Sequence, residues 1–418
     1  MSLREEVVNK FKERRQRLID GNVNSIPSPF KRFSNDFIGI EQGTYYLVTS
    51  YTKGGKSQFV SYLLYCALMF VYYNQKKIDI DLKILYFNLE ETKEKVLTRF
   101  ISWLLFDWTK WKVRLSPRDL MSSKNDKPLD QNVLDLIETD EIQDIIDFFE
   151  SHVEFSSETN PTGIYKFCRQ YAEDNGVITK KPAKYRDEFG NLHDTEVFSS
   201  YKANNPNQYV IGVVDTMNII DNERGFNKKQ SIDKLSEYFV LLRNRYNMSF
   251  FGIQQQNTKN ESIENVKFNK TRPSTDGLGD STYTAHDANI VLGIFSPFKF
   301  ELKEYLGYPV DKFRDHLRFL EVLVNRDGEL GGIVPLFFDG AVCNWSELPK
   351  MEDTAEMGKV YAHLRRINGL ACPIMFSVSY RKGNILYSLR KSIRHLLGTV
   401  KTVTFAKSHL KKKKVTNE

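Results

Sequence analysis

The chain has 418 residues, of which 41% are hydrophobic and 27% charged, and its formal net charge is +7. This composition is typical of a soluble globular protein, and no part of the chain except its ends demands disorder. The longest apolar stretch, residues 59–73, is shorter than the roughly 20 residues that span a bilayer. We therefore expect a buried helix there and a cytoplasmic protein that does not enter a membrane. The four cysteines are scattered and form no CxxC pair, which indicates neither a disulfide framework nor a zinc site.

At the N-terminus, residues 3–20 are charged throughout and predict an exposed amphipathic helix. The next clear element is a strand over residues 44–50, followed by the stretch TSYTKGGKSQF at 49–59 and then by an apolar helix. This stretch resembles the phosphate-binding loop G-x-x-x-x-G-K-[ST], with serine in the first place. Backbone amides of such a loop cradle phosphates, the lysine reaches the β and γ oxygens, and the hydroxyl holds magnesium. The alternative is a glycine turn with an incidental lysine. The strand–loop–helix order favours a site for ATP and Mg²⁺ that uses Ser50, Gly54, Gly55, Lys56 and Ser57.

Further strands are predicted at 81–92, 209–220 and 248–257. The first ends in Glu90 and Glu91, and a carboxylate at that edge is suited to activating water. The second reaches Asp215 after an apolar run, which is the pattern of a magnesium-binding acid, although a turn or helix cap is the plainer interpretation. The third ends in amides able to sense a γ-phosphate. Four strands with polar carboxyl ends predict an α/β fold with a doubly wound, mostly parallel sheet.

These elements, in this order, resemble the hexameric replicative helicases of the bacterial DnaB type and their phage relatives, which contain a RecA-like P-loop ATPase domain. The resemblance covers roughly residues 24–346. It implies that Lys56 and Ser57 are the loop's lysine and hydroxyl, and that Asp215 holds magnesium. It also implies that Glu90 rather than Glu91 is the catalytic base, and that Gln255 is the phosphate sensor.

Later in the chain, the stretch LVNRDG matches the motif from which the family's arginine finger reaches a neighbouring subunit. The resemblance gives this role to Arg326, whereas the family's preceding lysine is replaced by Val324. Glycine at 279 stands where the family has a DNA-binding arginine, before a strand expected to begin at Asp287. Nucleic-acid contacts are then expected from Lys267, Lys270, Arg272 and the backbone amides of Gly277 and Gly279.

We expect three parts in the chain. These are an N-terminal helix and subunit-contact linker over 1–23, the ATPase domain over 24–350, and a basic extension over 351–418. Residues 180–208 predict a hairpin inserted before the third strand, most simply a surface decoration. Residues 357–418 hold 14 Lys or Arg and one acidic residue, so they carry +13 and leave 7 − 13 = −6 for the remainder. That segment either contacts nucleic acid or is a solvated, solubilising tail.

The resemblance implies an ATP-dependent DNA helicase that forms a ring, a hexamer in the family, on single-stranded DNA in the bacterial or infected-host cytoplasm. A primase or a loader would be a further partner. Two alternatives remain open at the level of sequence. One is a RecA-like recombination or DNA-remodelling ATPase without processive unwinding, and the other is a non-enzymatic assembly or loader protein with a structural nucleotide site.

Overall fold

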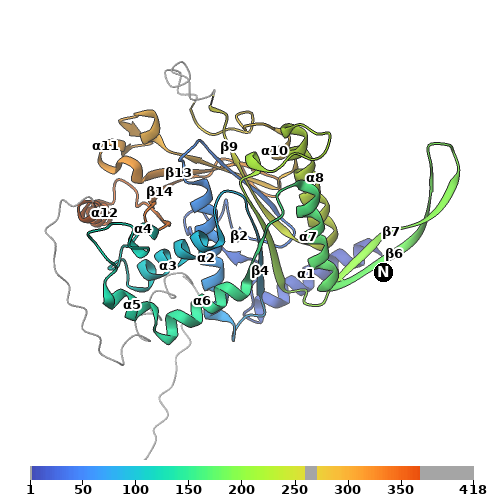
Figure 1. Ribbon diagram of the computed structural model, residues 1–418, viewed down its shortest axis with the longest axis horizontal. Coiled ribbons are helices and arrows are strands. Elements are labelled where there is room, and N and C mark those ends of the chain that lie inside the picture. Colours follow the sequence, from blue (N-terminus) through green and yellow to red (C-terminus); the bar gives the residue numbers. More distant parts are fainter. Residues whose placement is uncertain (1, 259–270, 368–418) are drawn as a thin grey trace, which may run out of the picture. The chain divides into compact units, whose positions relative to one another are not determined.

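A nine-stranded sheet forms the centre of the structure (Figure 1). The computed structural model describes residues 2–258 and 271–367. From one edge to the other, the strands are β15 (Asn344–Glu347), β14 (Ile333–Asp339), β13 (Leu317–Asn325), β10 (Ile290–Phe295), β3 (Tyr45–Ser50), β9 (Ser249–Gln255), β8 (Gln208–Asp215), β4 (Asp81–Asn88) and β5 (Val153–Ser156). Neighbours from β10 to β5 are parallel, whereas β13, β14 and β15 pair in antiparallel fashion.

Helices cover both faces of this sheet. Alternate residues of β3 point to opposite faces, so Tyr46 and Val48 join one buried apolar cluster and Tyr45 and Leu47 join another. The first cluster includes α2, α3 and α6, and the second includes α7, α8 and α10. The helices are α1 (Leu3–Ile19), α2 (Lys56–Asn74), α3 (Lys93–Trp108), α4 (Pro117–Leu120), α5 (Gln131–Ile137), α6 (Asp140–His152), α7 (Pro161–Asp174), α8 (Lys228–Tyr246), α10 (Tyr283–Asp287), α11 (Val310–Phe313) and α12 (Thr354–Ile367).

The four strands predicted from sequence correspond to β3, β4, β8 and β9. The chain leaves β3 near the middle of the sheet, forms β4 and β5 at one edge, and returns through β8 and β9 to pair with β3. This reversal confirms the doubly wound α/β sheet. The strand expected to begin at Asp287 is displaced, because Asp287 ends α10 and β10 begins at Ile290.

The N-terminal helix is confirmed as α1, and none of its residues is buried. Its Arg17 pairs with Asp79 at 2.7 Å, which holds the helix end beside the start of β4. Two short two-stranded sheets lie elsewhere, β1 (Ile26–Pro27) with β2 (Gly39–Ile40) and β11 (Glu304–Tyr305) with β12 (Tyr308–Pro309). No helix among the described residues combines the length and the apolar character that crossing a membrane requires.

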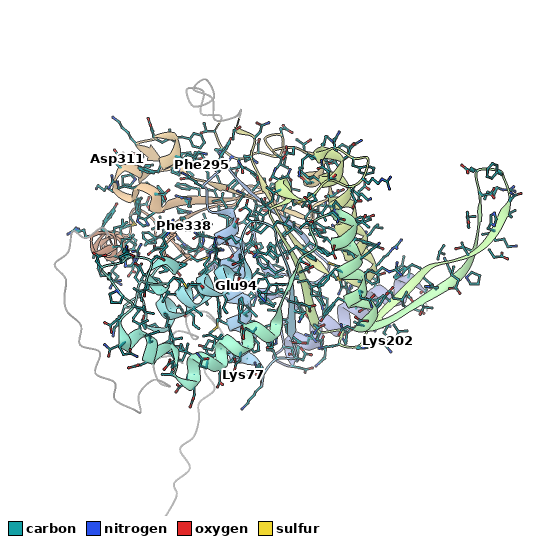
Figure 2. All side chains as sticks on the ribbon, in the orientation of Figure 1. Lys77, Glu94, Lys202, Phe295, Asp311 and Phe338 are labelled. Carbon is teal, nitrogen blue, oxygen red and sulfur yellow. The ribbon has the colours of Figure 1, made fainter. Side chains whose placement is uncertain are left out.

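The inserted hairpin is also confirmed, as β6 (Gly176–Arg186) and β7 (Leu192–Ala203). Its base packs on α8, where the rings of Phe198 and Tyr201 contact Tyr246. Figure 2 shows the side chains of its distal half standing clear of the other elements, and Phe189 near the turn is 82% exposed.

The boundary expected at residue 350 is wrong. Met357 and Leu364 of α12 are buried in a third apolar cluster together with Phe313 and Leu348. The compact unit therefore continues past residue 350 and includes α12. The rest of the expected basic extension, residues 368–418, lies outside the described residues.

One buried ion pair ties the antiparallel strands to the segment that follows α3. The Arg114 guanidinium donates two hydrogen bonds, at 2.6 and 2.8 Å, to the carboxylate of Asp339 at the end of β14. The Asp339 side chain is fully buried, so it depends on this partner for compensation of its charge.

We predict that Arg114→Ala lowers the free energy of unfolding by about 3 kcal/mol, because it leaves a buried carboxylate unpaired. Equilibrium denaturation with guanidinium chloride measures this. Lys124→Ala is the matched control, since Lys124 pairs with Asp119 at the surface and such pairs contribute about 0–1 kcal/mol. Equal effects of the two substitutions would contradict the prediction.

Candidate functional site

The loop after β3 is shaped by two glycines. Gly55 has φ +99 and is the N-cap of α2, and a Cβ there would lie 2.9 Å from a ring carbon of Trp345. A Cβ on Gly54 would lie 2.5 Å from the Ser50 hydroxyl oxygen. Both positions therefore require glycine. The Ser50 hydroxyl is buried and donates to the Tyr51 carbonyl at 2.9 Å. The Ser50 side chain thus supports the turn from inside, as a small residue at the first position of the loop can. A contribution of Ser50 to nucleotide binding stays a prediction.

Lys56 and Ser57 open α2 beside the end of β8. The Ser57 hydroxyl donates to Asp215 Oδ1 at 2.7 Å, and the Tyr86 hydroxyl donates to Asp215 Oδ2 at 3.4 Å. Burial raises the pKa of Asp215 to about 6, although the Ser57 hydrogen bond opposes this rise, and the negative charge of Glu90 adds to it. Burial also lowers the pKa of Lys56, an effect that the charges of Glu90 and Asp215 counteract. The residues predicted from separate strands are therefore brought together.

The two adjacent glutamates after β4 have different surroundings. Glu91 forms an ion pair with Arg99 of α3. Glu90 is exposed, and its charge acts on both Lys56 and Asp215. Glu90 is thus the carboxylate whose charge acts on Lys56, whereas Glu91 is held by Arg99 of α3.

Gln255 lies at the end of β9, directly against the loop. Its side-chain amide donates to the Thr52 hydroxyl at 2.5 Å, and its backbone N–H donates to Asn218 Oδ1 at 2.7 Å. A change in the position of Thr52 would therefore move the Gln255 side chain. The Gln255 backbone could then transmit this change to the segment that follows β9.

The predicted nucleic-acid residues differ from one another in their surroundings. The Gly279 N–H donates to the Gln255 carbonyl at 2.7 Å, and the Gly277 N–H donates to Ser274. Because these amides are already bonded within the chain, both glycines are removed from the candidate nucleic-acid interface. Arg272 is 43% exposed and pairs with Glu321. Lys267 and Lys270 lie outside the described residues.

Arg326 lies at the opposite end of the parallel strands from the phosphate loop. It is exposed and directly follows β13, where its N–H donates to the Asn289 carbonyl at 3.0 Å. The sheet register aligns Asn325 with Ile290 and Ile290 with Tyr46. Arg326, one residue further, therefore lies level with Tyr45 at the start of β3, about 17 Å along the sheet from Ser50. Val324, in the place of the family's lysine, is half-buried on the same strand.

The oxygen ligands around Ser57 suit magnesium. Mg²⁺ binds oxygen atoms and usually takes one or two protein ligands, with waters and substrate phosphates completing the shell. The Ser57 hydroxyl and the Asp215 carboxylate are already in contact and lie beside a lysine that could reach the same phosphates. Within the described ranges, no cluster of three or more His, Cys, Asp or Glu offers an alternative metal site.

Three residues at the site were not identified from sequence. Tyr86 contacts Asp215, Arg99 holds Glu91, and the fully buried Arg318 donates to the Gly54 carbonyl at 2.9 Å. Each is an isolated residue of a strand or a helix, without a motif around it. A single polar or aromatic residue in a strand or helix does not by itself indicate a functional site, because such residues also occur at ordinary, partly exposed positions.

No protein-family model matches the sequence, and no curated protein matches it. Solved structures do match. The ATPase domain of a phage helicase aligns with a TM-score of 0.56 at 15% identity, over 83% of this chain and 99% of that domain. A DnaB-like replicative helicase, described together with its interactions with primase, aligns with a TM-score of 0.55 at 15% identity, over 82% of this chain and 66% of that one. The chain therefore shares the fold of these two proteins, which confirms the predicted RecA-like α/β core.

We predict that Asp215→Asn stabilises the protein without nucleotide. The Asp215 carboxyl has a pKa of about 6 when folded, against 3.8 for an unperturbed aspartate. Folding therefore takes up a proton between these values, and stability falls as the pH rises towards about 6. At pH 7.5 the penalty is about 3 kcal/mol, and asparagine, which still accepts from Ser57, removes it.

Guanidinium denaturation at pH 7.5 and pH 5 measures the free energy of unfolding of Asp215→Asn and of the wild type. The increase in the variant should be larger at pH 7.5. Asp311→Asn, at an exposed position in α11, is the control and should change little at either pH. A loss of stability in Asp215→Asn at pH 7.5 would contradict the assignment of a destabilising, buried carboxylate.

Proposed function

We propose that this chain is an ATP hydrolase of the replicative-helicase type, which works as a ring of copies on single-stranded DNA. The main support is the separation of its functional groups. The groups predicted to bind and hydrolyse ATP gather at the carboxyl ends of the parallel strands; they are Lys56, Ser57, Glu90 and Asp215. Arg326 lies at the amino ends of these strands. A site that needs all of them can be completed only by a second copy. The fold shared with the phage helicase ATPase domain and the DnaB-like helicase supports the same proposal.

In the proposed site, the loop at 50–57 binds the triphosphate of ATP. Amides at the start of α2 and the Lys56 ammonium contact the phosphate oxygens. Ser57 and Asp215 hold magnesium, which when bound neutralises charge on the phosphates. Because Lys56 is half-buried, its charge is shielded from bulk water and acts strongly on a bound anion.

Glu90 orients the attacking water and accepts its proton. A base for this step must be free to approach the γ-phosphate, and Glu90 meets this condition better than Glu91, which is paired with Arg99. Gln255 contacts the loop through Thr52. Its backbone is bonded to Asn218 and Gly279, so it can transmit the state of the γ-phosphate to the segment beyond β9.

Arg326 of one copy stabilises the transition-state charge on the nucleotide of the next copy. An arginine supplied in trans is worth about 10³- to 10⁵-fold in turnover in well-studied phosphate-transfer enzymes. Val324 is uncharged and supplies no second cation beside Arg326, so the trans contribution rests on Arg326.

Binding to single-stranded DNA is proposed through Lys267, Lys270 and Arg272. Arg272 would have to exchange its Glu321 partner for a phosphate. A primase or a loader remains a proposed partner, by analogy with the DnaB-like helicase described with primase. Closed rings in electron micrographs would support this function, whereas filaments on DNA would favour a recombination ATPase.

We predict that Glu90→Gln reduces ATP turnover at least 100-fold while ATP binding stays within a few-fold of wild type. The substitution removes the base but keeps the size and the hydrogen-bonding capacity of the side chain. Phosphate release with magnesium and single-stranded DNA measures turnover, and calorimetry measures binding. Glu91→Gln is the matched control and should retain most activity. Equal losses in the two variants would remove Glu90 from its role.

We predict that Lys56→Ala and Arg326→Ala are each inactive alone but recover turnover when mixed. Mixing creates interfaces that pair an intact loop from the Arg326→Ala copy with an intact Arg326 from the Lys56→Ala copy. About a quarter of the interfaces should be native in an equal, random mixture, counting one of four equally probable pairings. Subunits are exchanged first, and mixed assembly is verified by native mass spectrometry. Full activity of Arg326→Ala alone, or mixed assemblies without recovery, would contradict the trans role.

A further inference from the structure

Arg318, at the start of β13, is completely buried. Its Nε donates to the Gly54 carbonyl at 2.9 Å, and its Nη1 donates to the carbonyls of Asp315 and Leu317 at 2.6 and 2.9 Å. Its Nη2 donates to the Asp315 carboxylate at 2.8 Å. The guanidinium also lies over the ring of Phe338, 4.9 Å from its centroid; Phe338 is labelled in Figure 2. A strand residue is thus bonded directly to the glycine turn of the phosphate loop.

Stability alone does not explain a buried arginine here. Its one carboxylate partner, Asp315, has a side chain that is 69% exposed, so solvent screens much of that attraction. Burial accordingly lowers the pKa of Arg318, while Asp315 opposes the change. The neighbours Leu317 and Phe319 are buried apolar residues, and an apolar side chain at 318 would avoid the desolvation penalty of a buried charge.

The hydrogen bond to Gly54 fixes the orientation of one peptide plane. The Gly54–Gly55 peptide is trans, so its carbonyl and its N–H point in opposite directions. With the carbonyl held by Arg318, the Gly55 N–H points away from β13. In the part of the chain that the structure describes, this N–H has no hydrogen-bond partner. Gly55 is also the N-cap of α2, where the helix dipole favours an anion.

We propose that Arg318 is a positioning residue, which orients the Gly54–Gly55 peptide so that the Gly55 N–H binds a phosphate oxygen of ATP. This inference rests on the proposed nucleotide site. A hydrogen bond from a charged donor is stronger than a neutral one, and it polarises the peptide so that its N–H is a better donor. Arg318 itself touches no substrate.

The test is ATP binding by the full-length protein, measured by calorimetry in EDTA and again in magnesium. Arg318→Met should weaken ATP binding at least tenfold, and by the same factor in both conditions, because the Gly55 N–H acts on phosphate directly. The interaction is present in both ground and transition states, so KM should rise while kcat at saturating ATP stays within about twofold. Arg314→Met, at an exposed arginine four residues earlier, is the matched control and should bind like wild type.

Thermal unfolding without nucleotide separates positioning from a loss of fold. We expect Arg318→Met to unfold at or above the wild-type temperature. If it does not fold, Arg318→Gln takes its place with the same expected direction. A folded variant that binds ATP within twofold of wild type overturns the inference, and so does failure of both variants to fold, which would assign Arg318 to stability. Absence of ATP binding by the wild type would instead contradict the proposed function.

Discussion

The structure depends on the pairing of β3 with β9 on one side and β10 on the other, all in parallel. This arrangement brings the loop after β3, the carboxylate at the end of β8 and the amide at the end of β9 to one edge of the sheet. The 2.7 Å contact between Ser57 and Asp215 follows from it, although the two residues are 158 positions apart. Without this register, none of the polar strand ends would share a site.

The antiparallel strands have the opposite consequence. Because β13 is antiparallel to β10, its start lies beside the loop. Its end lies at the amino ends of the parallel strands. The change of direction separates Arg326 from its own loop within a single copy. The strand order therefore keeps Arg326 away from the loop of its own copy, so the role proposed for this residue requires a second copy.

Sequence was sufficient for the elements whose signals are local. The strand, loop and helix around Lys56, the apolar run before Asp215 and the inserted hairpin are contiguous patterns, and each was predicted. The hairpin was expected over 180–208 and lies at 176–203. Contacts between distant residues were not accessible in this way. Gly277 and Gly279 look like free loop amides in the sequence, but β9 and Ser274 accept their hydrogen bonds. The boundary at 350 failed for the same reason, because only the folded chain shows that Met357 and Leu364 are buried.

β13 gives the proposed motor a direct link between successive sites. Arg318 and Arg326 flank its length, separated by about 26 Å at strand spacing. The strand pairs with β10 along its length, with one irregularity of register at Val291–Leu292, and with β14 from Leu317 to Glu321. A movement of Gly54 on nucleotide binding would act on Arg318 and, through the strand, on Arg326, the residue proposed to serve the neighbouring copy. Communication around a ring would then need no segment beyond the one that already completes each site.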